Sequence, residues 1–442
     1  MLHDFQQHIT QHFPFLKDKK LLSAISGGID SVVLSHLLHQ SKYDVSWAHC
    51  NFKLRKKESD LDEAFVNELA NKLGVKLHTI TFNTDDYASK NKLSIQMAAR
   101  ELRYNWFAEI LEENTLDYVL TAHQKEDVLE TFLINFTRGT GLEGLTGIPA
   151  INGQIVRPLL NFTRDEIHAF AIENNIEWKE DKSNASTKYF RNKIRHQIIP
   201  VLKELNPSLM QSFDKTLENL QGSQQIVNDK ITDFKKKITN LENEYQQFSI
   251  DEIKNTSNPK SYLFELLKEY NFTEWNDVVD LLDAQSGKQL LSKTHRLIKD
   301  RTHILVSSRQ SAVGSQKTKF TINEDAITFR NDSLYLKIEV QNSKTKAQKH
   351  KPKTALIDNS LLNFPLIVRK WEKGDYFYPI GMKGKKKLSK FFKDEKFSIL
   401  EKEKTWLLCN SNNEIVWIVG RRLDNRFKIT EDTTKTLKIT IQ

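Results

Sequence analysis

The first 140 residues alternate between short apolar runs and longer segments whose apolar positions recur every three or four residues. The short runs predict buried strands, at residues 21–25, 43–50, 75–82 and 118–122. The periodic segments predict amphipathic helices, at residues 31–39, 59–73, 94–112 and 125–136. Because strands that alternate with helices form parallel sheets, this region is predicted to be an α/β domain, a doubly wound, Rossmann-like parallel sheet with helices on both faces.

The pattern changes after Pro200. A long polar helical segment is predicted over residues 207–247. The compact apolar block at 251–306 predicts a small helical domain that ends in a strand near Ile304. Short strand-like runs return from Thr354 onward and predict a small α+β domain. The predicted boundaries are 1–205 for the α/β domain, 206–320 for the helical middle domain and 345–442 for the C-terminal domain.

Composition excludes several classes of protein. Hydrophobic residues make up 38% of the 442 positions, which is enough for cores and excludes wholesale disorder. With only Cys50 and Cys409, neither a disulfide framework nor a zinc site built from cysteines is expected. No apolar run approaches the roughly 18 residues of a membrane span, and the first residues show no apolar signal segment. The expected location is therefore a reducing cytoplasm, with no membrane partner.

The net charge of +9 is unevenly distributed. Residues 345–442 carry 22 Lys and Arg against 11 Asp and Glu, whereas the preceding residues carry 44 basic and 46 acidic side chains. A local positive field of this kind favours binding of a polyanion. The alternative is a Lys-rich surface with no partner.

One short motif stands between the first predicted strand and the helix that follows it. Its residues are Ser26-Gly27-Gly28-Ile29-Asp30-Ser31. The glycines allow the backbone to approach phosphates closely, and the helix start adds its positive dipole end. Asp30 would repel phosphate, so its presence favours Mg²⁺ binding or the orientation of a donor. The alternative is a tight turn with a helix cap; a Walker loop is excluded because no Gly-Lys-Ser/Thr follows.

This hexapeptide resembles the pyrophosphate loop (PP-loop) of the N-type ATP pyrophosphatases. The resemblance implies an enzyme that splits ATP into AMP and pyrophosphate while it adenylates a carbonyl-type oxygen, after which a nucleophile displaces AMP. Members that transfer sulfur generally need paired cysteines, and amidotransferase members need a cysteine nucleophile in a separate glutaminase unit. The two distant cysteines of this chain favour a member that takes nitrogen directly from a small amine.

Three further stretches resemble the tRNA(Ile)-lysidine synthetases. The first is Ala48-His49-Cys50-Asn51-Phe52-Lys53-Leu54-Arg55, with Phe52 where the family pattern has histidine. The second is Ala122-His123-Gln124-Lys125-Glu126-Asp127-Val128-Leu129-Glu130-Thr131, with Glu126 where the pattern has aspartate, followed by Arg138-Gly139-Thr140-Gly141. The third begins at Glu180-Asp181, continues with Tyr189, Arg191, Asn192 and Arg195, and ends at Pro200.

The resemblance implies roles for these residues. Asp30, Asp127, Glu130 and Arg195 are expected to be catalytic, with Asp30 also a candidate Mg²⁺ ligand. The hexapeptide and His49 are expected to bind ATP, and the lysine or the wobble nucleotide is assigned to His123, Arg138, Arg191 and Asn192. Other interpretations remain: Asp127 and Glu130 as solvated helix charges, Arg191 and Arg195 as partners of Glu180 and Asp181, and His49 as a structural residue.

The basic segment resembles the C-terminal domain of the longer family members. Its cationic residues are expected to contact the tRNA backbone without reading the base sequence. The residues expected to do so are Arg369, Lys383, Lys385, Lys386, Lys387 and Lys390. The alternative is a solvated charged face.

Taken as a family member, the chain is expected to use ATP and Mg²⁺ to adenylate the C2 oxygen of the wobble cytidine in a CAU-anticodon tRNA(Ile). The side-chain amine of free L-lysine would then displace AMP, and the product, lysidine, pairs with A instead of G. Two alternatives stay open, another PP-loop tRNA-modifying enzyme, such as a 2-thiolating one, and a non-catalytic tRNA-binding protein. The sequence leaves the oligomeric state open, with a homodimer as one option.

Overall fold

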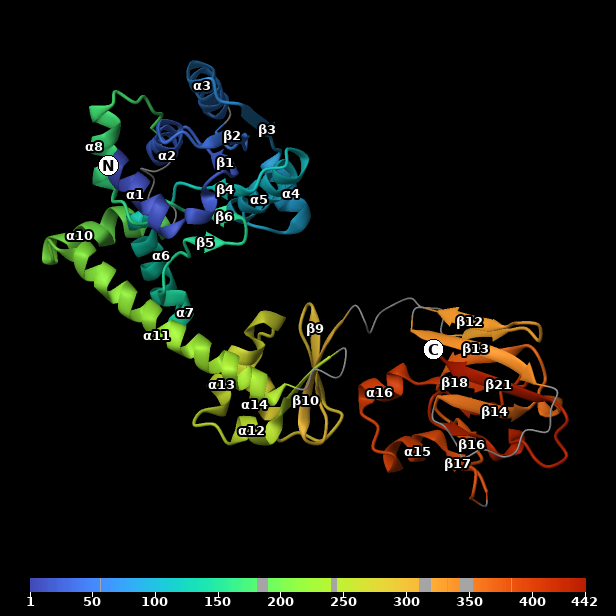
Figure 1. Cartoon of the computed structure of the whole chain (residues 1–442). Helices are drawn as coiled ribbons and strands as arrows, with labels where there is room; N and C mark the ends of the chain where they lie inside the picture. Colours follow the sequence, from blue (N-terminus) through green and yellow to red (C-terminus); the bar gives the residue numbers. More distant parts are fainter. Residues whose placement is uncertain are drawn as a thin grey trace. The chain divides into compact units, whose positions relative to one another are not determined.

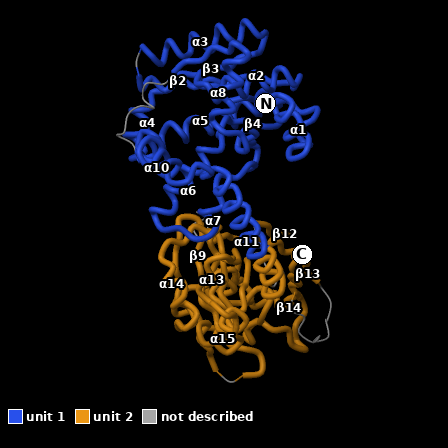
Figure 2. The backbone as a smooth tube through the Cα atoms, turned by 90° about the vertical axis from the view of Figure 1, so that its left-hand side faces the viewer, with its two compact units in different colours: residues 1–228 blue, residues 229–442 orange. Residues whose placement is uncertain are grey.

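The structure is a computed structural model that describes residues 1–55, 57–180, 190–239, 245–309, 319–331, 333–341, 353–382 and 384–442. The chain divides into two compact units, residues 1–228 and 229–442 (Figure 2). Each unit has its own hydrophobic cores. In the described stretches, no helix is both long enough and apolar enough to cross a membrane.

The first unit is built on a six-stranded sheet with the strand order β3-β2-β1-β4-β6-β5 (Figure 1). Its strands are β1 (Lys20–Ala24), β2 (Asp44–Asn51), β3 (Leu77–Thr81), β4 (Tyr118–Leu120), β5 (Ile151–Asn152) and β6 (Ile155–Val156). All pairs are parallel except β5 with β6, which is antiparallel. The predicted parallel α/β sheet is therefore confirmed.

Helices cover both faces of this sheet. The helices of the unit are α1 (Leu2–His12), α2 (Ile29–Gln40), α3 (Lys57–Leu73), α4 (Thr84–Asn91), α5 (Ile95–Glu113), α6 (Lys125–Arg138), α7 (Leu142–Leu145), α8 (Arg164–Glu173), α9 (Phe190–Lys193) and α10 (Ile199–Leu205). Leu21 of β1 packs in a core with α1, α2 and α8, whereas the next residue, Leu22, packs against α5 on the opposite face (Figure 1). This alternation explains why the strand is a continuous apolar run.

The order of the strands fixes where a ligand can bind. The chain passes from β1 outward to β2 and β3, and then returns to place β4 on the other side of β1. In open parallel sheets, ligands bind outside the carboxyl ends of the strands at such a reversal. The loops that leave β1 and β4 hold the Ser26–Ser31 motif and the residues around His123.

The long helix α11 (Leu209–Ile238) begins as predicted but ends earlier, because residues 246–249 form strand β7. The helices α12 (Ile250–Lys254), α13 (Pro259–Leu267) and α14 (Trp275–Asp280) follow. They accompany a four-stranded sheet with the order β7-β10-β9-β8, whose last three strands are β8 (Gln289–Leu291), β9 (His295–Lys299) and β10 (His303–Ser308). The prediction of a helical block with one strand missed this sheet, since Arg296 and Lys299 interrupt the apolar pattern of β9 although both are buried.

The C-terminal part consists of two sheets around a shared core. The first has the order β11-β15-β18-β19-β20, with β11 (Lys319–Ile322), β15 (Leu366–Lys370), β18 (Trp406–Cys409), β19 (Ile415–Ile418) and β20 (Arg422–Leu423). The second has the order β12-β13-β21-β14, with β12 (Thr328–Asn331), β13 (Leu334–Gln341), β14 (Thr354–Asp358) and β21 (Thr436–Ile441).

Strand β11 pairs with β15 and strand β13 with β21, so strands of these sheets lie ahead of the predicted boundary at residue 345. A short hairpin of β16 (Tyr376–Phe377) and β17 (Lys386–Lys387) precedes the helices α15 (Leu388–Asp394) and α16 (Ile399–Lys404) (Figure 1).

Candidate active site

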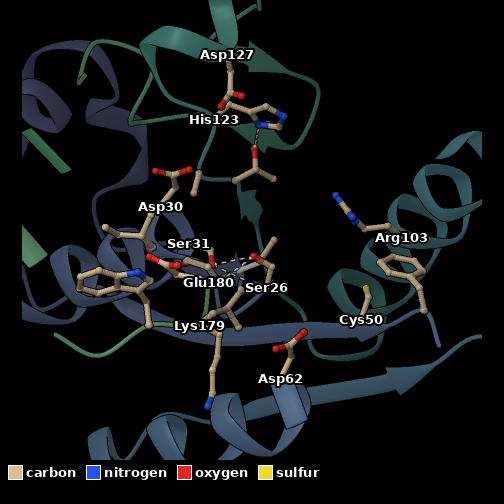
Figure 3. A pocket seen from close by; sticks show the side chains of 18 of the residues that line it. Ser26, Asp30, Ser31, Cys50, Asp62, Arg103, His123, Asp127, Lys179 and Glu180 are labelled. Atoms are coloured by element: carbon tan, nitrogen blue, oxygen red, sulfur yellow. Dashed lines mark hydrogen bonds between the residues drawn. The ribbon is translucent and has the colours of Figure 1, made fainter. Parts of the chain in front are cut away.

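A cavity of about 820 Å³ lies where the loops after β1 and β4 meet (Figure 3). The segment Lys179–Glu180 and the helical segment with Arg191 and Arg195 also line it. Many of the predicted site residues are thus brought together from three separate parts of the sequence. Those that line the cavity are Ser26, Gly28, Ile29, Asp30, Ser31, His123, Asp127, Arg191 and Arg195.

The loop after β1 has the conformation expected of an anion site. Gly27 has φ +91°, a region that favours glycine, and the Lys179 N–H donates to its carbonyl at 2.9 Å. The Ser31 hydroxyl donates to the Gly28 carbonyl at 2.9 Å and lies 3.1 Å from the Ser26 hydroxyl. Among the described residues no side chain caps the start of α2, so its first N–H groups can donate hydrogen bonds to a ligand.

Asp30 is the most unusual group of this loop. Its Oδ1 atom is buried and has no hydrogen-bond partner among the described residues. Burial raises the Asp30 pKa to about 6, and the nearby Asp127 carboxylate contributes to the rise. Figure 3 shows both carboxylates beside the cavity. A buried carboxylate oxygen without a hydrogen-bond partner is suited to a ligand that brings positive charge.

His123 leads from β4 toward helix α6. Its Nδ1 atom lies 3.0 Å from the Thr121 hydroxyl oxygen. Burial lowers the His123 pKa to about 3, and the positive charges of Arg157 and Arg191 lower it further. The imidazole is therefore neutral at pH 7 and can exchange hydrogen bonds with a ligand, but it does not supply positive charge.

Two acidic residues of α6 meet two arginines from the third stretch. Glu130 is fully buried and accepts from Arg191 Nε at 2.7 Å and from Arg195 Nη2 at 3.0 Å. Asp127 Oδ1 accepts from the same two guanidinium groups, at 3.3 Å from Arg191 Nη2 and 3.1 Å from Arg195 Nη2. Asp127 Oδ2 accepts from the Gln124 N–H at 3.0 Å, which caps the helix.

These contacts change the role expected of Glu130. Glu130 is not among the described residues that line the cavity. Both of its carboxylate oxygens accept hydrogen bonds from arginines. A direct contact between Glu130 and a reacting group does not fit this placement. Glu130 instead fixes Arg191 and Arg195, which do line the cavity. These arginines do form ion pairs, but with Asp127 and Glu130; of the partners expected from the sequence, Asp181 lies outside the described residues.

Four other predicted residues do not line the cavity formed by the described residues, and the first is Gly27, whose turn shapes the loop. His49 is buried, and its Nδ1–H donates to the Ile25 carbonyl at 2.9 Å, so it supports the loop from behind. Arg138 is exposed at the last position of α6, about 16 Å along the helix from Asp127. Asn192 is half-buried beside Arg191.

The two departures from the family pattern can be understood from their contacts. Phe52 stacks on Phe82 with ring centres 5.7 Å apart, and the Arg103 guanidinium lies over the Phe52 ring at 5.2 Å. Glu126 accepts from the Arg164 N–H at 3.0 Å, at the first residue of α8, and lies 3.5 Å from Lys203 Nζ. Phe52 therefore packs against Arg103, which lines the cavity. Glu126 connects α6 to α8 and α10 through its contacts with Arg164 and Lys203.

The sequence analysis missed Arg103 and Cys50, which also line the cavity. Arg103 lies on α5, whose pattern indicated only an amphipathic helix, and no motif marks it. Burial raises the Cys50 pKa to about 12, so its thiol stays protonated and is a poor nucleophile. This state does not favour sulfur-transfer chemistry at Cys50.

The predicted tRNA-contacting residues of the C-terminal domain fall into two groups. Arg369 is only 2% exposed and forms a bidentate pair with Asp375 at 2.8 Å, so the prediction that it contacts phosphate is wrong. Lys386 pairs with Asp394 at 2.9 Å and is mostly buried. The remaining described lysines are exposed, namely Lys385, Lys387 and Lys390. Lys383 lies outside the described residues.

Comparisons with known proteins agree along the whole chain. Residues 1–202 match the family model of the PP-loop domain, 241–309 the TilS substrate binding domain, and 366–439 the TilS substrate C-terminal domain. The chain is 40% identical to the tRNA(Ile)-lysidine synthase of Parabacteroides distasonis over 99% of each chain. It is also 40% identical to that of Bacteroides thetaiotaomicron, over 98% of this chain and 97% of the relative.

A more distant relative, the tRNA(Ile)-lysidine synthase of Clostridium perfringens, is 30% identical over 96% of this chain and 95% of its own. The match therefore extends over the catalytic, middle and C-terminal regions alike. With a PP-loop at the carboxyl end of β1 and relatives of this identity over nearly its full length, the chain belongs to the tRNA(Ile)-lysidine synthase family.

Proposed function

We propose that this protein ligates free L-lysine to C2 of the wobble cytidine in a CAU-anticodon tRNA(Ile), with ATP converted to AMP and pyrophosphate. The observation that carries the proposal is one cavity that joins an open PP-loop to Asp30, His123 and the Arg191–Arg195 pair, in a chain of this family. Family membership makes the chain an ATP-dependent tRNA-modifying ligase. Lysine and the anticodon are the finer part of the proposal.

The loop residues would hold the phosphates of ATP. The uncapped N–H groups at the start of α2 and the hydroxyls of Ser26 and Ser31 are the donors for phosphate oxygens. Arg191 and Arg195 approach the same cavity with their orientation fixed by Glu130. Cations held in this way stabilise the negative charge that develops as pyrophosphate departs.

Asp30 is the residue that fits Mg²⁺. Its Oδ1 atom is buried without a partner among the described residues, which is the environment of a carboxylate that binds a cation. The described residues contain no cluster of three or more acidic, histidine or cysteine side chains that could hold a metal alone. Mg²⁺ commonly binds one or two carboxylates together with substrate phosphates, so Asp30 would share the ion with ATP. Bound there, Mg²⁺ would neutralise phosphate charge.

The cavity lining also suits free lysine, which carries two ammonium groups and one carboxylate. Asp30, Asp127 and Glu180 supply negative charge, and Arg103 supplies positive charge on the α5 side. An attacking amine must be unprotonated, so the site must remove the proton that lysine carries at pH 7. The carboxylates of the cavity lining are the candidates to accept this proton.

The exposed lysines of the C-terminal domain are expected to contact tRNA phosphates. Replacing Lys385, Lys387 and Lys390 together by alanine should weaken tRNA binding and flatten its salt dependence. The log–log slope should fall by about 0.7–0.9 for each phosphate that is no longer neutralised. Lys386→Ala is the matched control, because its ammonium already pairs with Asp394, and it should leave the slope unchanged. Equal slopes for the triple variant and wild type would mean that these lysines do not contact tRNA phosphates.

The proposed reaction predicts a strict requirement for two substrates. Over many turnovers, AMP and pyrophosphate should accumulate in a one-to-one ratio with lysine incorporated into RNA, and AMP should form only with both tRNA(Ile) and lysine present. Sulfur incorporation into tRNA would instead support the thiolating alternative. Failure to form AMP under any combination of tRNA and amine would support the non-catalytic alternative.

A further inference from the structure

The β16–β17 hairpin of the C-terminal domain presents an aromatic side chain to solvent. In its pairing register, Tyr376 lies opposite Lys387 and Phe377 lies opposite Lys386. Successive side chains of a strand point to opposite faces, and opposed residues share a face. Phe377 is fully buried and packs with Phe391 and Phe392 of α15, so its face is the inner one. Tyr376 and Lys387 therefore occupy the outer face, where Tyr376 is 43% exposed.

Positive charge surrounds this tyrosine. The Lys385 ammonium lies 4.9 Å from the centre of the Tyr376 ring. Lys385 directly precedes β17, and its contact with the Tyr376 ring places its ammonium on the outer face as well. Met382, in the connection between the strands, is 53% exposed and adds apolar surface. We call the set of Tyr376, Lys385 and Lys387 the hairpin platform.

The neighbouring Tyr378 is less exposed to solvent than Tyr376. Tyr378 is half-buried, and the Arg426 guanidinium covers its ring at 4.6 Å. Arg426 in turn pairs with Asp424 at 3.0 Å and Glu414 at 2.6 Å, so it is engaged inside the domain. The Tyr378 ring is part of the packing, whereas a large part of the Tyr376 side chain faces solvent beside two exposed lysines.

We propose that the hairpin platform binds an unpaired nucleotide of the tRNA, with its base stacked on Tyr376 and its flanking phosphates held by Lys385 and Lys387. Proteins commonly bind single-stranded nucleic acid by stacking a base on an exposed aromatic ring while neighbouring cationic side chains contact the phosphates. A base inside a duplex has both of its faces covered by its neighbours, so only an unpaired base offers a face to the ring. The proposal rests on the proposed function for the identity of the RNA as tRNA.

The test uses the full chain and tRNA(Ile) transcripts, each with one unpaired adenosine replaced by the fluorescent analogue 2-aminopurine. Stacking on an aromatic ring changes the fluorescence of this base, so one position should respond to wild-type protein and lose its response with Tyr376→Ala. The same substitution should weaken tRNA binding roughly 5- to 150-fold, the range measured for one stacked base. The salt slope should stay unchanged, because no charge is removed.

Three variants separate stacking from folding. Tyr376→Phe keeps the ring and should bind as wild type, whereas Tyr376→Leu keeps apolar bulk and should bind as weakly as the alanine variant. Tyr335→Ala removes another exposed tyrosine of the same unit, 39% exposed with Arg330 over its ring, and should leave binding unchanged. Thermal unfolding of each variant shows whether the hairpin remains folded.

The proposal is overturned if Tyr376→Leu binds tRNA like wild type, or if no 2-aminopurine position depends on Tyr376. It is also overturned if the loss is equally large for a fully paired RNA duplex, since the ring would then contact the backbone. Lysine incorporation at saturating tRNA is a separate readout. Its absence from wild-type protein would count against the proposed reaction and not against the platform.

Discussion

Replacement of Asp30 by asparagine or alanine is expected to lower kcat for tRNA modification by at least about 100-fold, while tRNA affinity stays within twofold. The physical reason is the buried Oδ1 atom, which has no partner among the described residues and lies within the phosphate loop. No other described residue of that loop carries an acidic group. Steady-state kinetics and tRNA binding, measured on the same preparations, check both parts. Asp165→Asn, at an exposed first-turn position of α8, is the matched control.

The Asp30→Asn substitution should make the folded protein more stable above pH 6. Burial raises the Asp30 pKa from 3.8 to about 6, so the folded state holds the proton more tightly than the unfolded state does. The free energy of unfolding therefore falls as the pH rises from 3.8 through 6, and above 6 the ionised carboxylate is a net cost. An asparagine side chain never ionises, so Asp30→Asn should gain on the order of 1 kcal/mol at about pH 7.5 and nothing below about pH 4.

The pH dependence of kcat should run in the opposite direction to that of stability. If the ionised Asp30 carboxylate is required, kcat should rise with pH, and because bound Mg²⁺ favours the ionised form, the rise at saturating Mg²⁺ should lie below pH 6. Near-normal turnover by Asp30→Asn at saturating Mg²⁺ would show that the reaction does not require the Asp30 carboxylate. A variant that is less stable than wild type above pH 6 would contradict the burial argument.

Replacement of Glu130 by alanine is expected to produce the largest loss of stability, about 3–5 kcal/mol. Glu130 is fully buried, and its removal leaves the guanidinium groups of Arg191 and Arg195 with only their longer contacts to Asp127 Oδ1. For a unit of this size, such a loss lowers the Tm of the first unit by roughly 10 °C. Thermal unfolding followed by near-UV circular dichroism measures it.

Two further variants make the Glu130 result specific. Arg138→Ala changes an exposed residue at the end of the same helix and should change stability by less than about 0.5 kcal/mol. Glu130→Gln keeps the shape but removes the charge, and should lower kcat because the two arginines lose their fixed orientation. An unchanged Tm for Glu130→Ala would mean that the ion pairs contribute nothing to the fold.

Much of the first unit follows from its sequence. The apolar run of β1 and the periodic helix α2 have one physical cause, a sheet buried on both faces, and that cause is visible in the order of residues. The Ser26–Ser31 loop could be placed because glycine and serine at a strand-to-helix junction are typical of a backbone that approaches phosphate. The carboxyl ends of β1 and β4 then had to lie together.

Other features depend on tertiary pairing that one sequence does not encode locally. Glu130 and Arg195 are 65 residues apart, and nothing in either segment indicates that they share a buried ion pair. Arg369 resembles a surface cation in the sequence, yet the bidentate pair with Asp375 allows its burial. Strand β9 carries Arg296 and Lys299 at buried positions, so its apolar pattern is too weak to predict a strand.

The most direct test of the central claim is the fate of labelled lysine. The full-length protein is incubated with ATP, Mg²⁺, radiolabelled L-lysine and tRNA(Ile) with a CAU anticodon, and the RNA is digested to nucleosides. The label should appear in one modified nucleoside at the wobble position, resist mild base, and be absent when the wobble cytidine is replaced by uridine. Absence of label from the CAU tRNA, or label that mild base releases from the 3′ end, would contradict the proposed reaction.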